Sequence, residues 1–195
     1  MRSFAVLPAA GSSRRMGRPK LVLPWGASTI IETVLDAWQA SGVTKVVIAV
    51  RADDAELLEK CRSRSADVVV LEHETPDMKA SVLAALRYAA KYAPAADEPW
   101  LLSPADTPTI SANIIDRVLA EHRASQPAIV VPTFEGRRGH PVLLPWSVRS
   151  AIEGLKADEG INVLLAGAGV RLVELGERAV VEDIDTEAEY RASRP

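Results

Sequence analysis

Basic side chains and glycines are interleaved near the N-terminus, directly after a short apolar run. The stretch LPAAGSSRRMGRPKL, residues 7–21, contains Gly11, Gly17 and the four cations Arg14, Arg15, Arg18 and Lys20. Glycine lets the backbone approach a ligand closely, and backbone N–H groups together with arginine and lysine charges bind phosphates. Four cations can also form a solvated surface loop, but the interleaved apolar residues favour an anion-binding loop. The stretch has neither a Walker motif nor the G-x-G-x-x-G pattern of dinucleotide binding.

An isolated carboxylate follows another apolar run. Asp106 comes after Trp100–Leu102 and lies between Pro104 and Pro108. In open α/β sheets, ligands bind beyond the carboxyl ends of the strands. A carboxylate held there can bind Mg²⁺, which prefers one or two carboxylates together with phosphate and water. An aspartate in a loop is more commonly a turn or helix cap, but the two prolines restrict the backbone and favour a functional role.

A second acidic cluster lies near the C-terminus, in Glu182–Thr186. If this segment is extended, Asp183 and Asp185 point the same way, because side chains alternate along a strand. Two carboxylates on one side could contribute to a metal site. The alternative is that Asp185 or Thr186 only caps the last helix, and the residues by themselves favour neither interpretation.

Two further stretches carry polar groups in unusual surroundings. His140 is framed by Gly139 and Pro141 and follows two arginines, Arg137 and Arg138, which suit an anionic acceptor. Ser81 follows the stretch Asp77–Ala80, which could equally be the N-cap region of a helix.

The remaining sequence predicts the elements that must position these residues. Short β-branched and apolar runs indicate strands, and segments with apolar residues on one helical face indicate helices. We expect strands at 4–7, 45–50, 68–71, 100–102, 128–131, 142–144, 172–175 and 180–181, and helices at 29–42, 53–64, 81–92, 111–124, 147–155, 159–165 and from 186 onward. This order predicts an α/β fold, a Rossmann-like mostly parallel sheet with helices on both faces and a small antiparallel insertion after Pro132.

The composition limits the class of protein. The 195 residues carry a net charge of −3 and suit one domain, 1–195. This charge gives no reason to expect nucleic acid or a membrane as a partner, and no run approaches the ~18 apolar residues of a spanning helix. Cys61 is the only cysteine, so no internal disulfide can form and a cytoplasmic location is expected.

The motifs together resemble those of the MobA-like NTP transferase family, and among its members most closely the molybdenum cofactor cytidylyltransferases. The family's signature loop, roughly [L/P]-A-A-G-x-S-x-R-M-G-x-P-K, is matched by Pro8–Gly11, Ser13, Arg15–Gly17 and Pro19–Lys20. Its D-x-P and D-[IV]-D-T elements are matched by Asp106–Pro108 and Asp183–Thr186, and the G-x-R-G-H-P element of the cytidylyltransferases by Gly136–Pro141. Ala157 and Asn162 depart from a further acceptor segment of these enzymes.

The resemblance implies a nucleotide-diphospho-sugar transferase-like fold and an activity. The enzyme would couple an NTP, expected to be CTP, with a phosphorylated acceptor, expected to be the molybdopterin cofactor, and release pyrophosphate with the help of Mg²⁺. A molybdoenzyme or cofactor-insertion protein would be a possible partner. The implied catalytic residues are Arg15, Lys20 and Asp106, and the implied metal ligands are Asp106, Asp185 and Asp183. The implied nucleotide contacts are Pro8, Ala9, Ala10, Gly11, Ser12, Ser13, Arg15, Gly17, Lys20, Ser81 and Asp106, and the acceptor contacts are Arg138, Gly139, His140 and Pro141.

Other functions remain open at this point. A methylerythritol phosphate cytidylyltransferase has a loop that also begins Pro-Ala-Ala-Gly, but carries D-x-A-R where this chain has Asp106–Pro108. A sugar phosphate nucleotidyltransferase is possible, although the chain is short for one. A non-catalytic nucleotide-binding accessory protein for cofactor insertion is a further alternative. A nicotinamide-dependent reductase of Rossmann type is disfavoured, because its glycine fingerprint is missing.

Overall fold

The computed structural model describes residues 2–11, 16–73, 75–92, 94–122, 128–167 and 169–195. One sheet dominates it, with the strand order β10-β7-β9-β6-β1-β4-β5 and β8 paired to β7. A second, two-stranded sheet consists of β2 and β3. The strands are β1 Phe4–Pro8, β2 Pro24–Trp25, β3 Ser28–Thr29, β4 Lys45–Arg51, β5 Asp67–Leu71, β6 Pro99–Leu102, β7 Ile129–Phe134, β8 Arg137–Arg138, β9 Val142–Pro145 and β10 Val170–Glu174.

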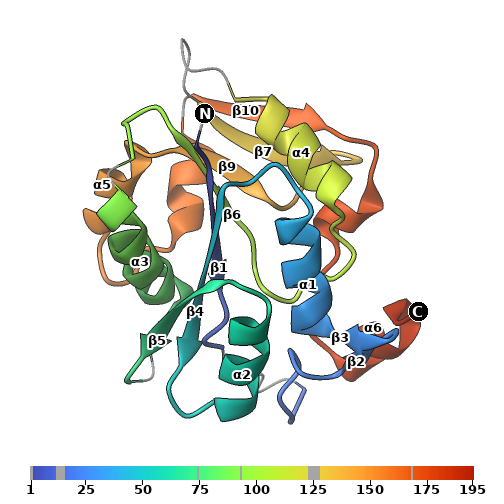
Figure 1. Cartoon of the computed structure of the whole chain (residues 1–195). Coiled ribbons are helices and arrows are strands. Elements are labelled where there is room, and N and C mark those ends of the chain that lie inside the picture. Colours follow the sequence, from blue (N-terminus) through green and yellow to red (C-terminus); the bar gives the residue numbers. More distant parts are fainter. Residues whose placement is uncertain (1, 12–15, 74, 93, 123–127, 168) are drawn as a thin grey trace.

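Helices cover both faces of the large sheet (Figure 1). The α-helices are α1 Ile30–Gln39, α2 Ala55–Ser63, α3 Met78–Ala89, α4 Ala112–Ala120, α5 Val148–Glu153 and α6 Glu187–Ser193, and the 3-10 helices are η1 Ala90–Tyr92, η2 Ile161–Ala166 and η3 Arg178–Val181. Helices α1, α2 and α4 contribute to one buried cluster, and α3 and α5 to the other. The expected α/β architecture is therefore confirmed.

Strand β1 is the centre of this arrangement. It pairs in parallel with β4 on one side and with β6 on the other. Its side chains alternate between the two faces, so Ala5 and Leu7 belong to one core and Phe4 and Val6 to the other. A strand buried on both faces needs the continuous apolar run that the sequence provides.

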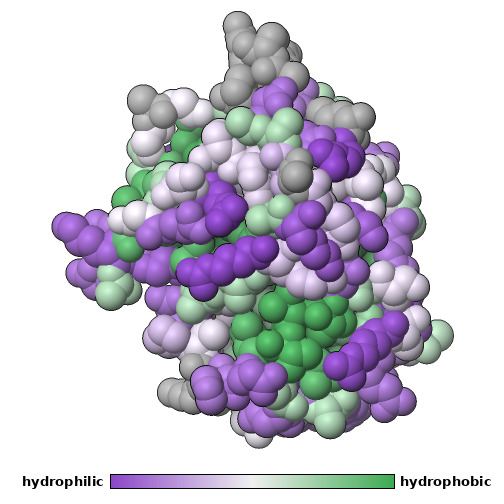
Figure 2. All heavy atoms as spheres, turned by 60° about the vertical axis from the view of Figure 1, so that its left-hand side comes forward, coloured by the Kyte–Doolittle hydropathy of each residue, from purple (hydrophilic) through white to green (hydrophobic). Residues whose placement is uncertain are grey.

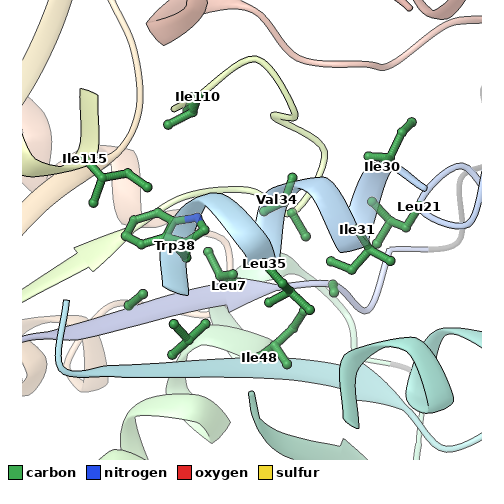
Figure 3. Close-up of a cluster of buried hydrophobic side chains, with 14 of the residues drawn as sticks. Leu7, Leu21, Ile30, Ile31, Val34, Leu35, Trp38, Ile48, Ile110 and Ile115 are labelled. Atoms are coloured by element: carbon green, nitrogen blue, oxygen red, sulfur yellow. The ribbon is translucent and has the colours of Figure 1, made fainter. Parts of the chain in front are cut away.

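Helix α1 fixes the segment that follows β1. Figure 3 shows its apolar face, which includes Ile31, Leu35 and Trp38, packed over Leu7 of β1 and Ile48 of β4. Thr29 and Glu32 form a capping box at its start, which satisfies backbone donors that have no partner within the helix. The start of α1 is thus a firm anchor for the loop between β1 and the helix.

The antiparallel insertion is also as expected. Strand β9 lies between β6 and β7 and is antiparallel to both, while β8 extends a short hairpin with β7. Between β7 and β8 the chain turns at Glu135 and Gly136, which both have positive φ, 50° and 75°.

One expected element near the C-terminus is wrong in type. The segment expected as a strand at 180–181 is the 3-10 helix η3. The chain leaves the sheet at Gly176, whose φ of 67° is left-handed, and the Val180 carbonyl then accepts a bond from the His140 amide at 2.7 Å. The helix expected at 159–165 is present, as the six-residue 3-10 helix η2 between Gly160 and Gly167.

Strand β5 forms the edge of the sheet that lies opposite β10, and this edge is apolar. All five residues of β5 are half-buried, and Val69 and Leu71 pack partly against the second core. Figure 2, which brings the side with α3 and β5 forward, shows a hydrophobic patch surrounded by hydrophilic side chains in its lower half. Within the described ranges, no helix combines the length and hydrophobicity needed to cross a bilayer.

The first prediction concerns Gly139, where the hairpin approaches η3. A Cβ at this position would lie 2.6 Å from the Val180 carbonyl carbon and closer still to its oxygen. Gly139→Ala is therefore expected to lower the free energy of unfolding by about 1–3 kcal/mol, the usual cost of overpacking. Urea denaturation measures this. Gly154→Ala is the control, because its Cβ would make only ordinary contacts of 3.6 Å, and equal effects of the two substitutions would contradict the prediction.

Candidate functional site

The signature loop, residues 7–21, is held at both of its described ends. After β1, the Ala9 amide donates to the Ala49 carbonyl of β4 at 2.9 Å. At the other end, the Leu23 amide donates to the Lys20 carbonyl at 3.1 Å, and the Ile31 amide of α1 donates to the Leu21 carbonyl at 2.9 Å. The backbone at Lys20 is thus fixed to the start of α1, so its side chain projects from a defined position.

Asp106 lies in a turn at the carboxyl end of β6. The Thr107 hydroxyl donates to the Pro104 carbonyl at 3.0 Å and lies 3.3 Å from the Ser103 hydroxyl. The Ser103 amide in turn donates to the Val6 carbonyl of β1 at 3.3 Å. Asp106 does not cap the next helix, because Ser111 is the N-cap of α4. The functional interpretation of Asp106 is consistent with this placement.

Asp185 comes to the same place from the far end of the chain. The amide of Ile184 donates to the carbonyl of Asp106 at 3.0 Å, and the Ile184 side chain is buried in the core. Thr186, not Asp185, caps α6, since the Thr186 side chain accepts from the Glu189 amide within a capping box. The N-cap of α6 therefore does not use the carboxylate of Asp185, which has a partner elsewhere.

That partner is Lys20. Its ammonium donates to Oδ2 of Asp106 in a short contact and to Oδ1 of Asp185 at 2.9 Å. All three side chains are largely buried. Burial would lower the pKa of Lys20, but the charges of Asp106 and Asp185 and their hydrogen bonds outweigh this and raise the pKa. Lys20 thus stays charged at neutral pH and neutralises part of the acidic cluster.

The acid pair, Asp106 and Asp185, has capacity for a divalent cation. Oδ1 of Asp106 is buried and has no hydrogen-bond partner among the described residues, and an unsatisfied buried carboxylate oxygen is a ligand of the kind that Mg²⁺ or Mn²⁺ prefers. No three acidic, histidine or cysteine side chains of the described part of the chain already form a complete ligand set. Oxygen atoms from a bound phosphate and from water would have to complete the coordination.

Asp183 adds a third negative charge beside the acid pair. Partial desolvation and the charges of Asp106 and Asp185 raise its pKa. The residue remains exposed, so solvent screens part of this effect. Among the side chains that the structure describes here, three carboxylates lie near one ammonium, which favours a further cation at this point of the site.

The nucleotide side of the site is described only in part. Ser12, Ser13, Arg14 and Arg15 lie outside the described residues. Pro8 ends β1, and Ala9 and Ala10 are buried. A Cβ on Gly11 would meet no atom of the described residues within 4 Å, and Gly17 adopts a φ of 66°. A pocket of about 290 Å³ adjoins the loop; its lining includes Gly11, Gly17, Arg18, Lys20, Arg51 and Asp54.

Arg51 is a residue that the sequence analysis missed. It ends β4, the strand next to β1, so it lies at the same edge of the sheet as the signature loop. Asp53 holds its guanidinium through two bonds, of 2.8 and 3.2 Å. Its position directly after a buried strand is the signal that could have identified it.

Arg18 and Ser81 have partners within the protein. Arg18 forms an ion pair of 2.6 Å with Glu187 of α6 and lies over the ring of Tyr190. Ser81 is buried on α3, with its hydroxyl 3.0 Å from that of Thr75. Its expected contact with a nucleotide stays a prediction.

The four residues expected to bind the acceptor lie on the hairpin and on the segment after it. Arg138 is exposed and donates to the Leu165 carbonyl of η2 at 2.9 Å. Gly139 packs against Val180, and the bond between His140 and Pro141 is cis. Burial lowers the pKa of His140, and its Nδ1 is buried without a partner among the described residues. The lowered pKa favours the neutral imidazole.

Comparison with known proteins defines the class. The sequence matches the family described as the MobA-like NTP transferase domain over residues 5–175. The chain therefore belongs to this family, and the expected enzyme class, nucleotidyltransferase, is confirmed.

Particular relatives carry several names. The nicotine blue oxidoreductase of Paenarthrobacter nicotinovorans is 28% identical over 197 residues, covering 95% of this chain and 94% of that protein. The molybdenum cofactor cytidylyltransferase of Escherichia coli K12 is 27% identical over 188 residues, covering 95% and 92%. A Bacillus mycoides protein named probable molybdenum cofactor guanylyltransferase is 28% identical over 173 residues, covering 86% and 82%.

Solved structures share the fold. Rv0371c of Mycobacterium tuberculosis H37Rv superposes with a TM-score of 0.81 at 24% identity, covering 98% of this chain and 97% of that one. Its complex with manganese gives 0.76 at 22%, with the same coverage. A nucleotidyl transferase of Methanothermobacter gives 0.81 at 23%, covering 99% and 96%. At these identities the likeness establishes the fold alone.

The second prediction follows from the charge on Asp183. A carboxyl group whose pKa is raised by folding makes the protein less stable as the pH rises through that pKa. Asp183→Asn removes this charge, so in metal-free buffer it is expected to raise the free energy of unfolding at pH 7. The gain should shrink as the pH approaches the ordinary value of 3.8. Urea unfolding across this range measures it, and a gain independent of pH would contradict the assignment.

Proposed function

We propose that this protein transfers a nucleotidyl group from an NTP to the phosphate of a molybdopterin-type acceptor and releases pyrophosphate. CTP is the favoured NTP, and Mg²⁺ is the favoured metal. The observation that carries the proposal is the convergence of Lys20, Asp106 and Asp185 beside the signature loop. These groups meet at the carboxyl end of parallel strands, where α/β sheets bind ligands. We further propose that residues 1–195 act as one nucleotidyltransferase domain.

The chemistry needs no nucleophile from the protein. An oxygen of the acceptor phosphate forms a bond to the α-phosphorus in line, while the bond from that phosphorus to the bridging oxygen breaks. The bonding electrons leave with pyrophosphate. The protein contributes positioning and charge stabilisation. A divalent cation on Asp106 and Asp185 would supply neutralisation of the phosphate charges.

The residues of this chain have separate tasks in that reaction. Lys20 and the loop amides stabilise negative charge on the phosphates, with Arg15 in the same role by its motif position. Asp106 and Asp185 would hold a divalent cation, with Asp183 behind them. Arg138 to Pro141 face the acceptor. The partly buried placement of Lys20 and Asp106 limits competition from water, which strengthens the interactions of these two side chains.

The choice of base and acceptor rests on sequence. The Ala9-Ala10-Gly11 form of the loop resembles the members that use CTP, and a cytidylyltransferase and guanylyltransferases for the molybdenum cofactor occur among the relatives. Mg²⁺ is proposed on the oxygen donors of the acid pair, and the manganese complex of a structural neighbour is consistent with a divalent cation in this fold.

An oxidoreductase activity is the second candidate. One relative of nearly equal length bears that name. The Lys20 ammonium between the carboxylates of Asp106 and Asp185 has no evident use in hydride transfer, whereas such a charged cluster suits the binding of phosphates. Nucleotidyl transfer is therefore preferred.

The third prediction tests the activity. Pyrophosphate release with CTP, GTP, ATP or UTP and molybdopterin or polyol phosphates should require a divalent cation and be greatest with CTP and molybdopterin. Asp106→Asn should lower turnover by about 10²–10³, the usual effect of removing one preorganised electrostatic group. Asp36→Asn, an exposed aspartate paired with Arg64, is the isosteric control and should leave turnover unchanged. No release with any pair, or near-normal turnover of Asp106→Asn, would overturn the proposal.

The fourth prediction concerns Arg51. If its guanidinium contacts the nucleotide from the wall of the pocket, Arg51→Gln should raise the dissociation constant for CTP about tenfold, in line with the loss of a charge-assisted hydrogen bond. Arg64→Gln is the matched control, because Arg64 pairs with Asp36 on the surface formed by α1 and α2. Calorimetric titration gives both constants. Equal affinity of the two variants would remove Arg51 from the site.

A further inference from the structure

The ammonium of Lys20 occupies the position of a cation between the two acids. It is held by one oxygen of each carboxylate, while the other oxygen of Asp106 is buried without a partner among the described residues. Among the described residues of this cluster, the three carboxylates of Asp106, Asp183 and Asp185 outnumber the single ammonium of Lys20. The cluster therefore attracts cations, but its centre is already filled from within the chain.

We propose that Lys20 and a divalent cation hold the acid pair alternately, and that the triphosphate of the incoming nucleotide draws Lys20 away. The metal is then bound firmly only together with the nucleotide. This inference rests on the proposed function, since it takes the acid pair as the metal site and an NTP as the anion.

An anion bound in the pocket beside the signature loop would be a second partner within reach of Lys20. Lys20 belongs both to the acid pair and to the lining of the pocket beside the signature loop. Arg18 and Arg51 line the same pocket together with one acid, Asp54, so basic side chains outnumber acidic ones in its described lining and favour an anion. Lysine also suits an exchange of this kind, because its ammonium is a compact charge on a flexible stem that can move without rearranging the backbone.

Electrostatics makes the two occupants exclude one another. An ammonium in contact with both carboxylates would lie within a few ångströms of a cation bound to them, and such repulsion is strong where water is scarce. Without metal, Lys20 therefore holds the carboxylates of Asp106 and Asp185 together. It also weakens the binding of a metal that arrives without nucleotide. The alternative is a permanent structural ion pair, which would make metal and nucleotide affinities independent of the bond between Lys20 and the acids.

Nucleotide binding without metal tests one side of the exchange. In EDTA, Asp185→Asn weakens the hold on Lys20, so it should bind CTP several-fold more tightly than the wild type. Asp183→Asn is the matched control: it removes the same charge from the same cluster, but no hydrogen bond between Asp183 and Lys20 is among those described. Equal affinity of the two variants in calorimetric titration would show that only charge matters and would overturn the proposal.

Metal binding without nucleotide tests the other side. Lys20→Met should bind Mn²⁺ at least about tenfold more tightly than the wild type, because the competing ammonium is gone. Arg18→Met, which removes a charge that is paired with Glu187, should resemble the wild type. Electron paramagnetic resonance of free Mn²⁺ gives both constants, and circular dichroism establishes that each variant is folded. Unchanged Mn²⁺ affinity of folded Lys20→Met would overturn the proposal; if this variant does not fold, the Asp185→Asn measurement decides.

These readouts are separate from turnover. Binding shifts as expected without pyrophosphate release would uphold the exchange and reject the proposed reaction. Pyrophosphate release without either shift would uphold the reaction and reject the exchange. If no nucleotide binds to the wild type, no triphosphate can draw Lys20 away, and the proposal is overturned.

Discussion

The structure depends on one electrostatic constraint: two carboxylates from distant parts of the chain share a single ammonium. Asp106 and Asp185 would repel one another in a partly buried site, and Lys20 between them removes that repulsion. Burying ions is costly even when they are paired, so this cluster is expected to add little to the free energy of unfolding. Such a cluster suits the proposed exchange, in which a divalent cation replaces the Lys20 ammonium and the ammonium then binds phosphate.

Local contacts and hydrogen bonds of the surrounding fold bring these three groups together. The buried strand β1 places the signature loop beside the turn of Asp106, and α1 anchors the far end of the loop near Leu21. The bond from the Ile184 amide to the Asp106 carbonyl joins the C-terminal segment to the same point. The missing side chain of Gly139 lets η3 approach the hairpin, which directs the chain towards Ile184. Each contact is local, but together they connect parts of the chain that are far apart in sequence.

Much of this could be predicted from the sequence, and the rest could not for physical reasons. The spacing of apolar residues in α1 and their continuous run in β1 predict which side chains are buried, so both elements were expected in the right places. The strand expected at 180–181 was wrong, because the left-handed turn at Gly176 takes the chain out of the sheet. The motifs indicated Lys20, Asp106 and Asp185 separately, but their mutual contact depends on tertiary structure, as does the position of Arg51 beside the loop.

The most direct measurement is the position of manganese in crystals grown with CTP, determined from its anomalous scattering. Our account predicts a peak within coordination distance of Asp106 and Asp185, with the ammonium of Lys20 moved from these carboxylates to the phosphates. Manganese bound elsewhere, or bound at the acid pair while Lys20 still holds both carboxylates, would contradict it.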